Sequence, residues 1–541
     1  MATSSAATVA DVICRKKIET EVATVLVHLK KLLRVRNQYR SPLLRLPTEI
    51  TIHILSFVME NMGSSPVWRS IFATCYHIRT IMCNATILWR KVDLSLGRAA
   101  EYVLMKSKGN PLEVVARFNP GDELGTVQRG SVLLHWKDQW VHQGCRLRAL
   151  AFYGPPSSLP RLSWIFEMSL PCLDRLKFHV IPGIHDDVMS NPIPLQLPTG
   201  TPLRELDLRN VTLPWSSDLF TGLRELHLDF RDVTVSIMED ELIRIFEVSP
   251  RLESLSLLHF KEVIPADGHQ QLSPKRIVRL PALTLLELDN DPKVIGYTLA
   301  CMDTPALASL KIRSRTSNWD AARSLNYFFP DNRLPKELFS DPPVLKVWRP
   351  DQLEEIPFLG FGIGSLEVHF EIDVGDAEAT HCATAACFQL VPPSVTTLKL
   401  ESVELDIEEW RKFFRSHPEV RSIKCTDFHG GPMSRSFWDA LAPEEHRYQA
   451  ILCPRLEYIH CKMYTDEAEQ LKLLTICLWH RRSAGFKLRH LKITEPKGWA
   501  HTVADIIDSM VEVLEIDFPS KAQQKWGRDC LPYELNKFRI F

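Results

Sequence analysis

The segment Leu203-Arg204-Glu205-Leu206-Asp207-Leu208 recurs twenty residues later as Leu223-Arg224-Glu225-Leu226-His227-Leu228. In both copies the first, fourth and sixth positions are leucine, and the other positions are polar or charged. Such alternation predicts a short β-strand with one buried face. One strand of this length cannot bury its leucines alone, so a neighbouring copy must cover them. The two segments therefore indicate a stack of repeated units.

The same pattern, apolar-x-x-apolar-x-apolar, extends over most of the chain. With substitutions, it starts at Leu147, Leu173, Leu203, Leu223, Leu252, Leu283, Leu307, Ile363, Val395, Val420, Leu456, Leu488 and Val511. The long gap before Ile363 is interpreted as two units, with Val344 and Val347 marking the hidden one. The starts are then about 28 residues apart on average, which is typical of irregular leucine-rich repeats.

Apolar residues at helical spacing lie between the strand patterns. The predicted helix faces are Leu242, Ile245 and Phe246; Ile407, Trp410, Phe413 and Phe414; Leu471, Leu474 and Leu478; and Val503, Ile506, Ile507 and Met510. Strand plus helix is one unit, and stacked units form a solenoid. We therefore expect an α/β fold over residues 147–517, with parallel strands inside and helices outside.

The polar residues between the leucines face away from the core, so they are the default binding surface. On the later strands these residues and their neighbours are mostly basic: Lys399, Arg421, Lys424, Tyr458, His460, Lys462, Arg489 and Lys492. One interpretation is a site for an acidic or phosphorylated segment of a target protein, since Arg and Lys bind carboxylate and phosphate. The other is a solvated face with ordinary charge scatter, because Glu512, Glu515 and Asp517 follow.

The N-terminal region carries a different set of landmarks. They are Leu46-Pro47-Thr48-Glu49-Ile50, then Cys75 and Arg79, then Leu88-Trp89-Arg90. Pro47 stands where a helix can begin, because proline fixes a helical φ and lacks only an N–H that the first turn leaves unused. In order and spacing the set resembles the F-box, although Thr74 and Ile78 stand where that family has valine and tryptophan.

The flanks are similar to those of a large F-box family of mushroom-forming fungi with C-terminal leucine-rich repeats. The resemblance rests on Tyr39-Arg40-Ser41-Pro42 and Gly109-Asn110-Pro111-Leu112-Glu113. It implies docking onto the Skp adaptor, and through it a cullin, by an apolar helical surface. The residues carried over to that surface are Leu46, Pro47, Ile50, Ile54, Leu88 and Trp89. The alternative is that these residues form the internal core of a helical cap on the repeats.

A leader helix precedes this module. Residues Ile18, Val22, Val25, Leu29 and Leu32 recur at intervals of four and three, which is typical of an amphipathic helix or coiled coil. Eight basic residues face only two acidic ones between Arg15 and Arg40. A solvated face, self-association and contact with an anionic partner all fit. The expected domains are 1–41 leader helix, 42–95 F-box, 96–146 connecting region or cap, 147–517 solenoid and 518–541 tail or cap.

Composition excludes several classes of protein. The chain has 541 residues, with 65 basic and 66 acidic ones, so it lacks the strong field of a dedicated nucleic-acid or membrane binder. We expect neither partner. No apolar run is long enough to cross a bilayer and no secretory signal is recognisable, so we expect a cytoplasmic or nuclear protein. The 13 cysteines show no disulfide framework.

Catalytic motifs are also missing from the sequence. It contains no phosphate-binding loop, no nucleophile elbow and no metalloprotease motif. Two groups, Cys453, His460, Cys461, Cys477 and His480, and His381, Cys382 and Cys387, lack the Cys-x-x-Cys spacing of structural zinc sites. We expect no catalytic residue, no cofactor and no metal. An enzyme hidden in the segment from Ser314 to Pro343 is the remaining catalytic alternative.

The F-box resemblance, together with the repeats, implies a substrate-recognition adaptor of a Skp–cullin–F-box ubiquitin ligase. In such an adaptor we expect the F-box to dock the Skp adaptor, the repeats to bind a target protein, and the partners to perform the catalysis. The alternative is an interaction scaffold without ubiquitin chemistry, in which the altered middle landmark weakens adaptor docking.

Overall fold

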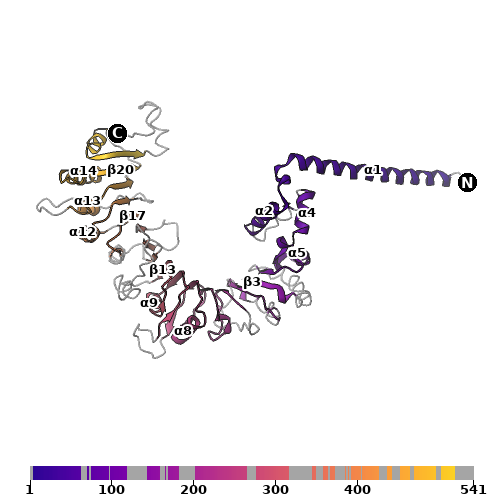
Figure 1. Ribbon diagram of the computed structural model, residues 1–541, viewed down its shortest axis with the longest axis horizontal. Coiled ribbons are helices and arrows are strands. Elements are labelled where there is room, and N and C mark those ends of the chain that lie inside the picture. Colours follow the sequence, from indigo (N-terminus) through magenta and orange to yellow (C-terminus); the bar gives the residue numbers. More distant parts are fainter. Residues whose placement is uncertain are drawn as a thin grey trace. The chain divides into compact units, whose positions relative to one another are not determined.

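The fold was analysed in a computed structural model (Figure 1). It describes residues 4–61, 70–71, 73, 75–96, 98–118, 143–156, 158, 165, 168–181, 202–264, 276–315, 344–348, 358–363, 366–371, 384, 388, 391–401, 403, 405–425, 435–441, 451–462, 468–494 and 501–517. Its contacts divide the chain into two units. Unit 1 comprises Met1–Asp186 and Leu195–Pro202, and unit 2 comprises Asp187–Pro194 and Leu203–Phe541.

Unit 1 begins with helices. They are α1 (Ser4–Arg40), the short 3₁₀ helix η1 (Pro42–Arg45), α2 (Thr48–Asn61), α4 (Tyr76–Asn84), η2 (Thr86–Trp89), η3 (Leu94–Leu96) and α5 (Arg98–Ser107). Pro47 directly precedes α2, as predicted. The five residues of the apolar seam on α1 are between 48% and 65% exposed. The Arg34 guanidinium lies 3.6 Å from the centroid of the Tyr76 ring, so α1 contacts α4.

The helical module, here η1, α2, α4 and η2, has a core of its own. Its buried apolar side chains are Leu55, Ile78, Ile81, Met82, Leu88 and Trp89. Trp89 is 1% exposed, and its Nε1 donates a hydrogen bond of 2.6 Å to the carbonyl oxygen of Met82. Its ring meets the Tyr102 ring of α5 edge-on, with 5.5 Å between centroids. Trp89 therefore fastens the module to the next helix.

Four parallel strands complete unit 1: β1 (Lys91–Asp93), β2 (Leu112–Arg117), β3 (Leu147–Gly154) and β4 (Arg175–Val180). The short η4 (Gly144–Arg146) leads into β3. In β3 and β4 the predicted apolar positions lie in register, Phe152 beside Phe178. The strand β2 falls in the region expected to be connecting. The sequence of β2 does not alternate between apolar and polar residues, because the consecutive residues Val114, Val115 and Ala116 are all buried.

Unit 2 opens with five strands, the first strand set: β5 (Glu205–Arg209), β6 (Glu225–Asp229), β8 (Ser254–Leu258), β11 (Leu285–Asn290) and β13 (Ser309–Arg315). Each pairs in parallel with the next. The fourth position of the pattern stays in register throughout, as Leu206, Leu226, Leu255, Leu286 and Leu310. Each of these leucines is at most 1% exposed. The repeating leucines therefore build a continuous core.

Helix α8 (Glu239–Val248) lies between β6 and β8 in the chain, and α9 (Pro292–Ala300) lies between β11 and β13. The predicted face of α8, Leu242, Ile245 and Phe246, is buried. Asp291 caps α9 by accepting a hydrogen bond of 2.9 Å from the Lys293 N–H, and Pro292 fills the first turn. Further short elements are η6 (Asp218–Phe220) and the parallel pairs β7 (Ser236–Met238) with β9 (Glu262–Ile264) and β10 (Val278–Arg279) with β12 (Met302–Asp303).

The middle of unit 2 departs from the predicted order. Strand β16 (Leu366–Glu371) pairs in parallel with β13, β15 (Phe358–Ile363) is antiparallel to both β16 and β14 (Val344–Trp348), and β14 pairs in parallel with the next set. The predictions that all strands are parallel and that Ile363 and Leu366 share one strand are therefore wrong. Only Gly364 and Ser365 separate β15 from β16, and so short a connection permits only antiparallel pairing.

The second strand set consists of β17 (Thr397–Glu401), β18 (Ser422–Cys425), β19 (Tyr458–Lys462), β20 (Leu488–Thr494) and β21 (Val511–Asp517), all parallel. Its helices are α12 (Ile407–Ser416), α13 (Arg435–Leu441), α14 (Ala468–Ser483) and α15 (His501–Asp508). Helix α13 contacts both α12 and α14, and these helices lie to one side of the strands (Figure 1). Trp410 of α12 stacks on Phe414, with 5.6 Å between centroids, and is fully buried.

The described part of the chain thus has the predicted α/β architecture, a parallel-strand sheet with helices. The tail from Phe518, the residues His381, Cys382 and Cys387, and almost all of the segment from Ser314 to Pro343 lie outside the described residues. None of the described helices combines the length and the apolar character needed to span a membrane.

Candidate functional site

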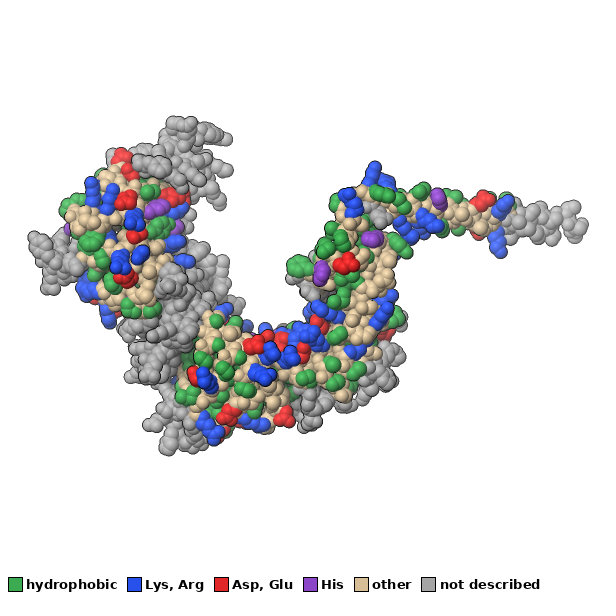
Figure 2. All heavy atoms as spheres, in the orientation of Figure 1, with side chains coloured by type: hydrophobic (Ala, Val, Ile, Leu, Met, Phe, Trp, Pro, Cys, Tyr) green, Lys and Arg blue, Asp and Glu red, His purple; other side chains and the backbone are tan. Residues whose placement is uncertain are grey.

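The first predicted surface lies on the helical module. Along α2, Ile50 is 47% exposed and Ile54 is 40% exposed, and Phe57, one turn further, is 68% exposed. Spacings of four and three residues place the three side chains on one side of the helix. Figure 2 shows apolar side chains at the surface of α2. These three residues are called the apolar strip below.

The six predicted adaptor-binding residues fall into two groups. Pro47, Ile50 and Ile54 are exposed and Leu46 is half-buried, so these four lie at the surface. Leu88 and Trp89 are buried in the core of the module. The structure therefore brings the first four together around the start of α2 and uses the last two as packing.

The second predicted surface follows the second strand set. Lys399 of β17 lies directly opposite Lys424 of β18, which lies opposite His460 of β19. The register continues to Lys492 of β20. It also places Lys346 of β14 opposite Lys399. Lys346 was missed because its strand was expected beside β13. Lys346, Lys399, Lys424 and His460 are called the basic row below.

Two of the predicted basic residues on β20 are already paired. The Nζ of Lys492 lies 2.9 Å from Glu515 Oε1 and 2.6 Å from Asp517 Oδ2. These contacts raise the pKa of Lys492, and the hydrogen bond from Lys492 lowers the pKa of Glu515. Nη1 of Arg489 lies 3.2 Å from Glu457 Oε2. The positive charge of β20 is therefore neutralised within the chain.

The basic residues of β17 and β18 differ from those of β20. Within the described residues, Lys399, Arg421 and Lys424 form no ion pair with a carboxylate. Lys424 Nζ lies 5.8 Å from the centroid of the Tyr458 ring, a cation–π contact. Figure 2 shows Lys and Arg side chains with acidic ones among them on this part of the chain. The side chain of Lys462 lies outside the described part.

His460 is held without a hydrogen-bond partner at one ring nitrogen. Its Nε2 is buried and finds no donor or acceptor among the described residues. Burial lowers the pKa of His460, and the positive charges of Lys492 and Lys424 lower it further, against the opposing effect of Asp517 and Glu515. Burial and the neighbouring lysines therefore both disfavour the charged form of the His460 ring.

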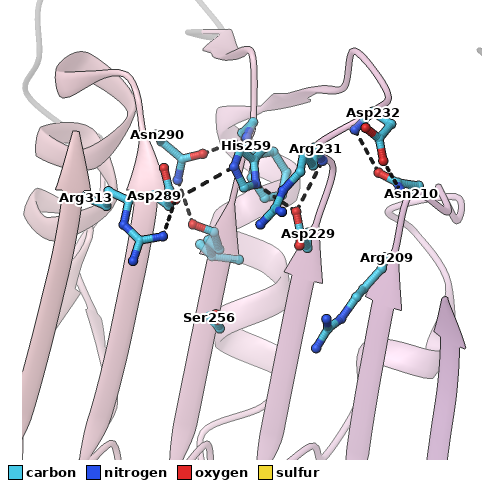
Figure 3. Close-up of polar contacts among 12 residues, drawn as sticks. Arg209, Asn210, Asp229, Arg231, Asp232, Ser256, His259, Asp289, Asn290 and Arg313 are labelled. Atoms are coloured by element: carbon cyan, nitrogen blue, oxygen red, sulfur yellow. Dashed lines mark hydrogen bonds and ion pairs between the residues drawn. The ribbon is translucent and has the colours of Figure 1, made fainter. Parts of the chain in front are cut away.

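A polar cluster that the sequence did not predict lies at the ends of the first strand set (Figure 3). Nδ1 of His259 lies 2.7 Å from Asp229 Oδ1, and its Nε2 lies 3.7 Å from Asp289 Oδ2. Arg313 Nη1 lies 3.3 Å from the same Asp289 oxygen. Burial alone would raise the pKa of Asp229, but the hydrogen bond from His259 and the nearby charges of His259 and Arg231 outweigh it, and the pKa is lowered. We call His259, Asp229, Asp289 and Arg313 the strand-end cluster.

The strand-end cluster stabilises backbone that has left the regular strand. His259 has a φ of 64°, in the left-handed region, and its N–H donates a hydrogen bond of 2.6 Å to the carbonyl oxygen of Asp289. Beside it, the Asn290 amide donates to the Leu257 carbonyl at 2.7 Å and accepts from the Phe260 N–H at 2.6 Å. Asn290 and the His259 N–H therefore satisfy the strand ends, and the side chains of the cluster contact one another. A sequence signal existed, because an aspartate directly follows the last leucine of the pattern in both β6 and β11.

The cysteines near the basic row behave as buried apolar side chains. Burial raises the pKa of the Cys461 thiol to about 12 and that of the Cys477 thiol to about 11. Cys461 lies opposite Cys425 in the sheet, at the third apolar position of the pattern. Among the described side chains, no group of three or more His, Cys, Asp or Glu residues could hold a metal ion.

Two comparisons, with models of protein families and with curated proteins, found no match.

Proposed function

We propose that the chain is a substrate-recognition adaptor of a Skp–cullin–F-box ubiquitin ligase, in which residues 42–95 are the F-box and the leucine-rich repeats bind a target protein. The observation that carries the proposal is the apolar strip on α2. It begins directly after the Leu46-Pro47 landmark, at the place where the F-box resemblance puts adaptor contacts.

The physical argument concerns surplus apolar surface. The helical module already fills its own core with Leu55, Ile81 and Trp89, so Ile50 and Ile54 have no room inside it. An apolar helix face that stays in water gains free energy when a partner groove covers it, at about 25 cal/mol per Å² of apolar area removed from water. A few such side chains at the centre of an interface supply most of its binding energy.

In this proposal the chain performs no chemistry itself. It holds a target near the ubiquitin-conjugating enzyme that the cullin recruits, and so raises the effective concentration of the target's lysines. The absence of a nucleophile and base motif in the sequence agrees with that role. Buried Leu88 and Trp89 favour a second candidate, a scaffold without ubiquitin chemistry, because they reduce the surface left for adaptor docking to the start of α2.

The test is co-purification of the Skp adaptor and cullin from fungal lysate with the tagged full chain. The variant replaces Ile50 and Ile54 by glutamate. Both side chains are exposed, so the module should stay folded, which circular dichroism checks. The matched control is Met105→Glu on α5, where the apolar side chain is 66% exposed but lies outside the strip.

We expect the unchanged chain and the Met105→Glu chain to retain adaptor and cullin, and the double variant to lose both. Loss by the Met105→Glu chain as well, or retention by the double variant, contradicts docking through the apolar strip. If the unchanged chain retains neither protein, the scaffold is the better account.

A further inference from the structure

The basic row places like charges side by side. Lys346, Lys399 and Lys424 occupy directly opposed positions on three neighbouring parallel strands. Neighbouring strands lie about 4.8 Å apart. Like charges directly opposite each other in a sheet destabilise it, whereas opposite charges stabilise it. The row is therefore an arrangement that folding alone does not favour.

The same row position elsewhere in unit 2 shows the favoured arrangement. On β11 and β13 it pairs Glu287 with Lys311, and on β20 and β21 it pairs Lys492 with Glu515. Lys492 and Glu515 form an ion pair of 2.9 Å. Carboxylates are thus tolerated at this position on both sides of the basic row. Within the described part of the chain no carboxylate forms an ion pair with Lys399 or Lys424, so their positive charge is open to a group from outside the chain.

A second row of polar side chains runs beside the lysines. Thr397, Ser422 and Tyr458 lie in register on β17, β18 and β19, two residues before the basic row on each strand. Residues two apart on a strand share one face, about 6.6 Å from each other. Among the described residues, none of these three hydroxyl groups forms a hydrogen bond. The face thus offers a line of charges next to a line of hydroxyl groups.

We propose that the basic row binds an acidic segment of a target protein, one that presents a line of carboxylates. This inference rests on the proposed function, since it names the class of target that the repeats hold. The hydroxyl groups would contribute hydrogen bonds to the same carboxylates or to the backbone of the segment. His460 lies at the end of the row, opposite Lys424, and its Nε2, which has no partner among the described residues, offers a further polar contact.

The spacing of the lysines in the basic row favours carboxylates over other anions as ligands. Lysines are point charges spaced one per strand, whereas a phosphate group is held best by several donors that converge on it, above all the fork of an arginine. Arg421 is a described arginine near the basic row, but it lies outside the row, one residue before β18. A line of single carboxylates matches lysines that are spaced one per strand.

The length of the basic row determines the length of the peptide that can test the proposal. Three strand spacings from β14 to β19 amount to about 14 Å. A helix of about ten residues spans that distance, and one glutamate per turn repeats every ~5.4 Å, close to the spacing of the lysines. The probe is a fluorescently labelled, alanine-rich peptide of this length with one glutamate per turn. Its control has glutamine in place of each glutamate.

The experiment measures fluorescence anisotropy with the full chain. We expect Lys399→Glu together with Lys424→Glu to weaken binding of the acidic probe by about tenfold or more, since each reversal removes one attraction and adds a repulsion. The matched control is Lys311→Glu, an exposed lysine at the same row position on β13. It should leave binding unchanged. Raising salt from about 0.1 to about 1 M, which shortens the Debye length from about 10 to about 3 Å, should weaken binding by the unchanged chain.

Several results would overturn the inference. The double variant could bind the acidic probe as well as the unchanged chain does, or Lys311→Glu could weaken binding equally. A phosphoserine peptide or a single-stranded oligonucleotide of the same charge could bind more tightly than the acidic probe. Adaptor co-purification with the Lys399→Glu, Lys424→Glu chain separates the two proposals, because retained adaptor with lost peptide binding leaves the proposed function intact.

Discussion

The two strand sets of unit 2 share one apolar pattern but differ in how their charged side chains are paired. In the first set, Asp229 and Asp289 are buried at the strand ends and matched by His259 and Arg313. In the second set, positive charges lie on the outer face of β17 and β18, where no described carboxylate of the chain meets them. In the first arrangement the charged groups contact one another within the protein, whereas in the second they meet no acidic partner among the described residues.

The comparison separates what holds the fold from what is free to serve a partner. The leucine register continues through both sets, so burial of apolar surface stabilises each in the same way. The charged positions are not dictated by that register. A buried charge must be paired or hydrogen-bonded to be tolerated, whereas an exposed one can remain unpaired at little cost. Changes to buried charges should therefore lower stability, and changes to exposed ones should alter binding.

The largest effect is expected at Arg481, a buried cation of the second strand set. Arg481 is 1% exposed, and its guanidinium donates hydrogen bonds of 2.9 Å and 3.0 Å to the carbonyl oxygens of Leu452 and Cys453. Arg481→Ala leaves both carbonyls unsatisfied and opens a cavity, so we expect a loss of about 3 kcal/mol in the free energy of unfolding. Urea denaturation measures it.

The neighbouring residue provides the control for this change. Arg482 is exposed and donates a hydrogen bond of 2.6 Å to the carbonyl oxygen of Ser509. We expect Arg482→Ala to cost less than about 1 kcal/mol, because water replaces the lost donor. Equal losses of stability in Arg481→Ala and Arg482→Ala would contradict this prediction, because they would show that burial of the charge does not determine the size of the loss.

The next effect concerns the strand-end cluster. His259→Ala leaves two carboxylates, Asp229 and Asp289, facing a gap without the ring between them, so we expect a loss of about 2 kcal/mol. His227→Ala is the control, because His227 is more exposed and its Nε2 lies 3.9 Å from the nearest Asp207 oxygen. A loss at His227 as large as that at His259 would mean that the cluster adds nothing beyond ordinary packing.

The sequence predicted the repeating framework because leucine spacing reflects burial directly. It predicted the buried faces of α8 and α12, and it placed Lys399, Lys424 and His460 on adjacent strands. It did not predict that β15 would run antiparallel or that β14 would lie beside β17. Pairing partners there depend on connections far apart in the chain, and the two-residue link after Ile363 was hidden inside an apparent repeat.

The candidate sites were predicted less completely than the fold, for a related reason. A side chain's neighbours across strands follow from register, so the ion pairs of Lys492 could not be read from composition. The burial of Trp89 was likewise open, since an apolar residue fits both a core and a docking surface. The strand-end cluster was missed because His259 and its two aspartates are about thirty residues apart in the chain.

The pH dependence of stability offers a sharper comparison of the two sets. The pKa of Asp229 is lowered in the folded chain by the His259 hydrogen bond and nearby positive charge, against the opposing effect of burial. A depressed carboxyl pKa contributes stability above the unfolded value, about 3.9, and that contribution is lost as pH falls through the folded pKa. We expect Asp229→Asn to flatten the acid side of the stability profile, measured by urea denaturation from neutral to acidic pH. An unchanged acid side would assign the acid sensitivity to other carboxyls.

The smallest effect, and the one that separates the two sets most directly, is expected in the basic row. Lys399→Glu places a carboxylate opposite Lys424 and Lys346, so it replaces a repulsion by an attraction across neighbouring strands. Because Lys399 is exposed, the free energy of unfolding should stay within about 0.5 kcal/mol of the unchanged value, or rise slightly. Lys492→Ala, which breaks contacts to Glu515 and Asp517, should instead lower the free energy of unfolding by up to about 1 kcal/mol.

If Lys399→Glu lowered stability as much as Lys492→Ala does, Lys399 would have a structural partner. Unchanged stability together with lost peptide binding is the pattern of a residue kept for a ligand, because such a residue contributes nothing to the fold that its replacement cannot supply.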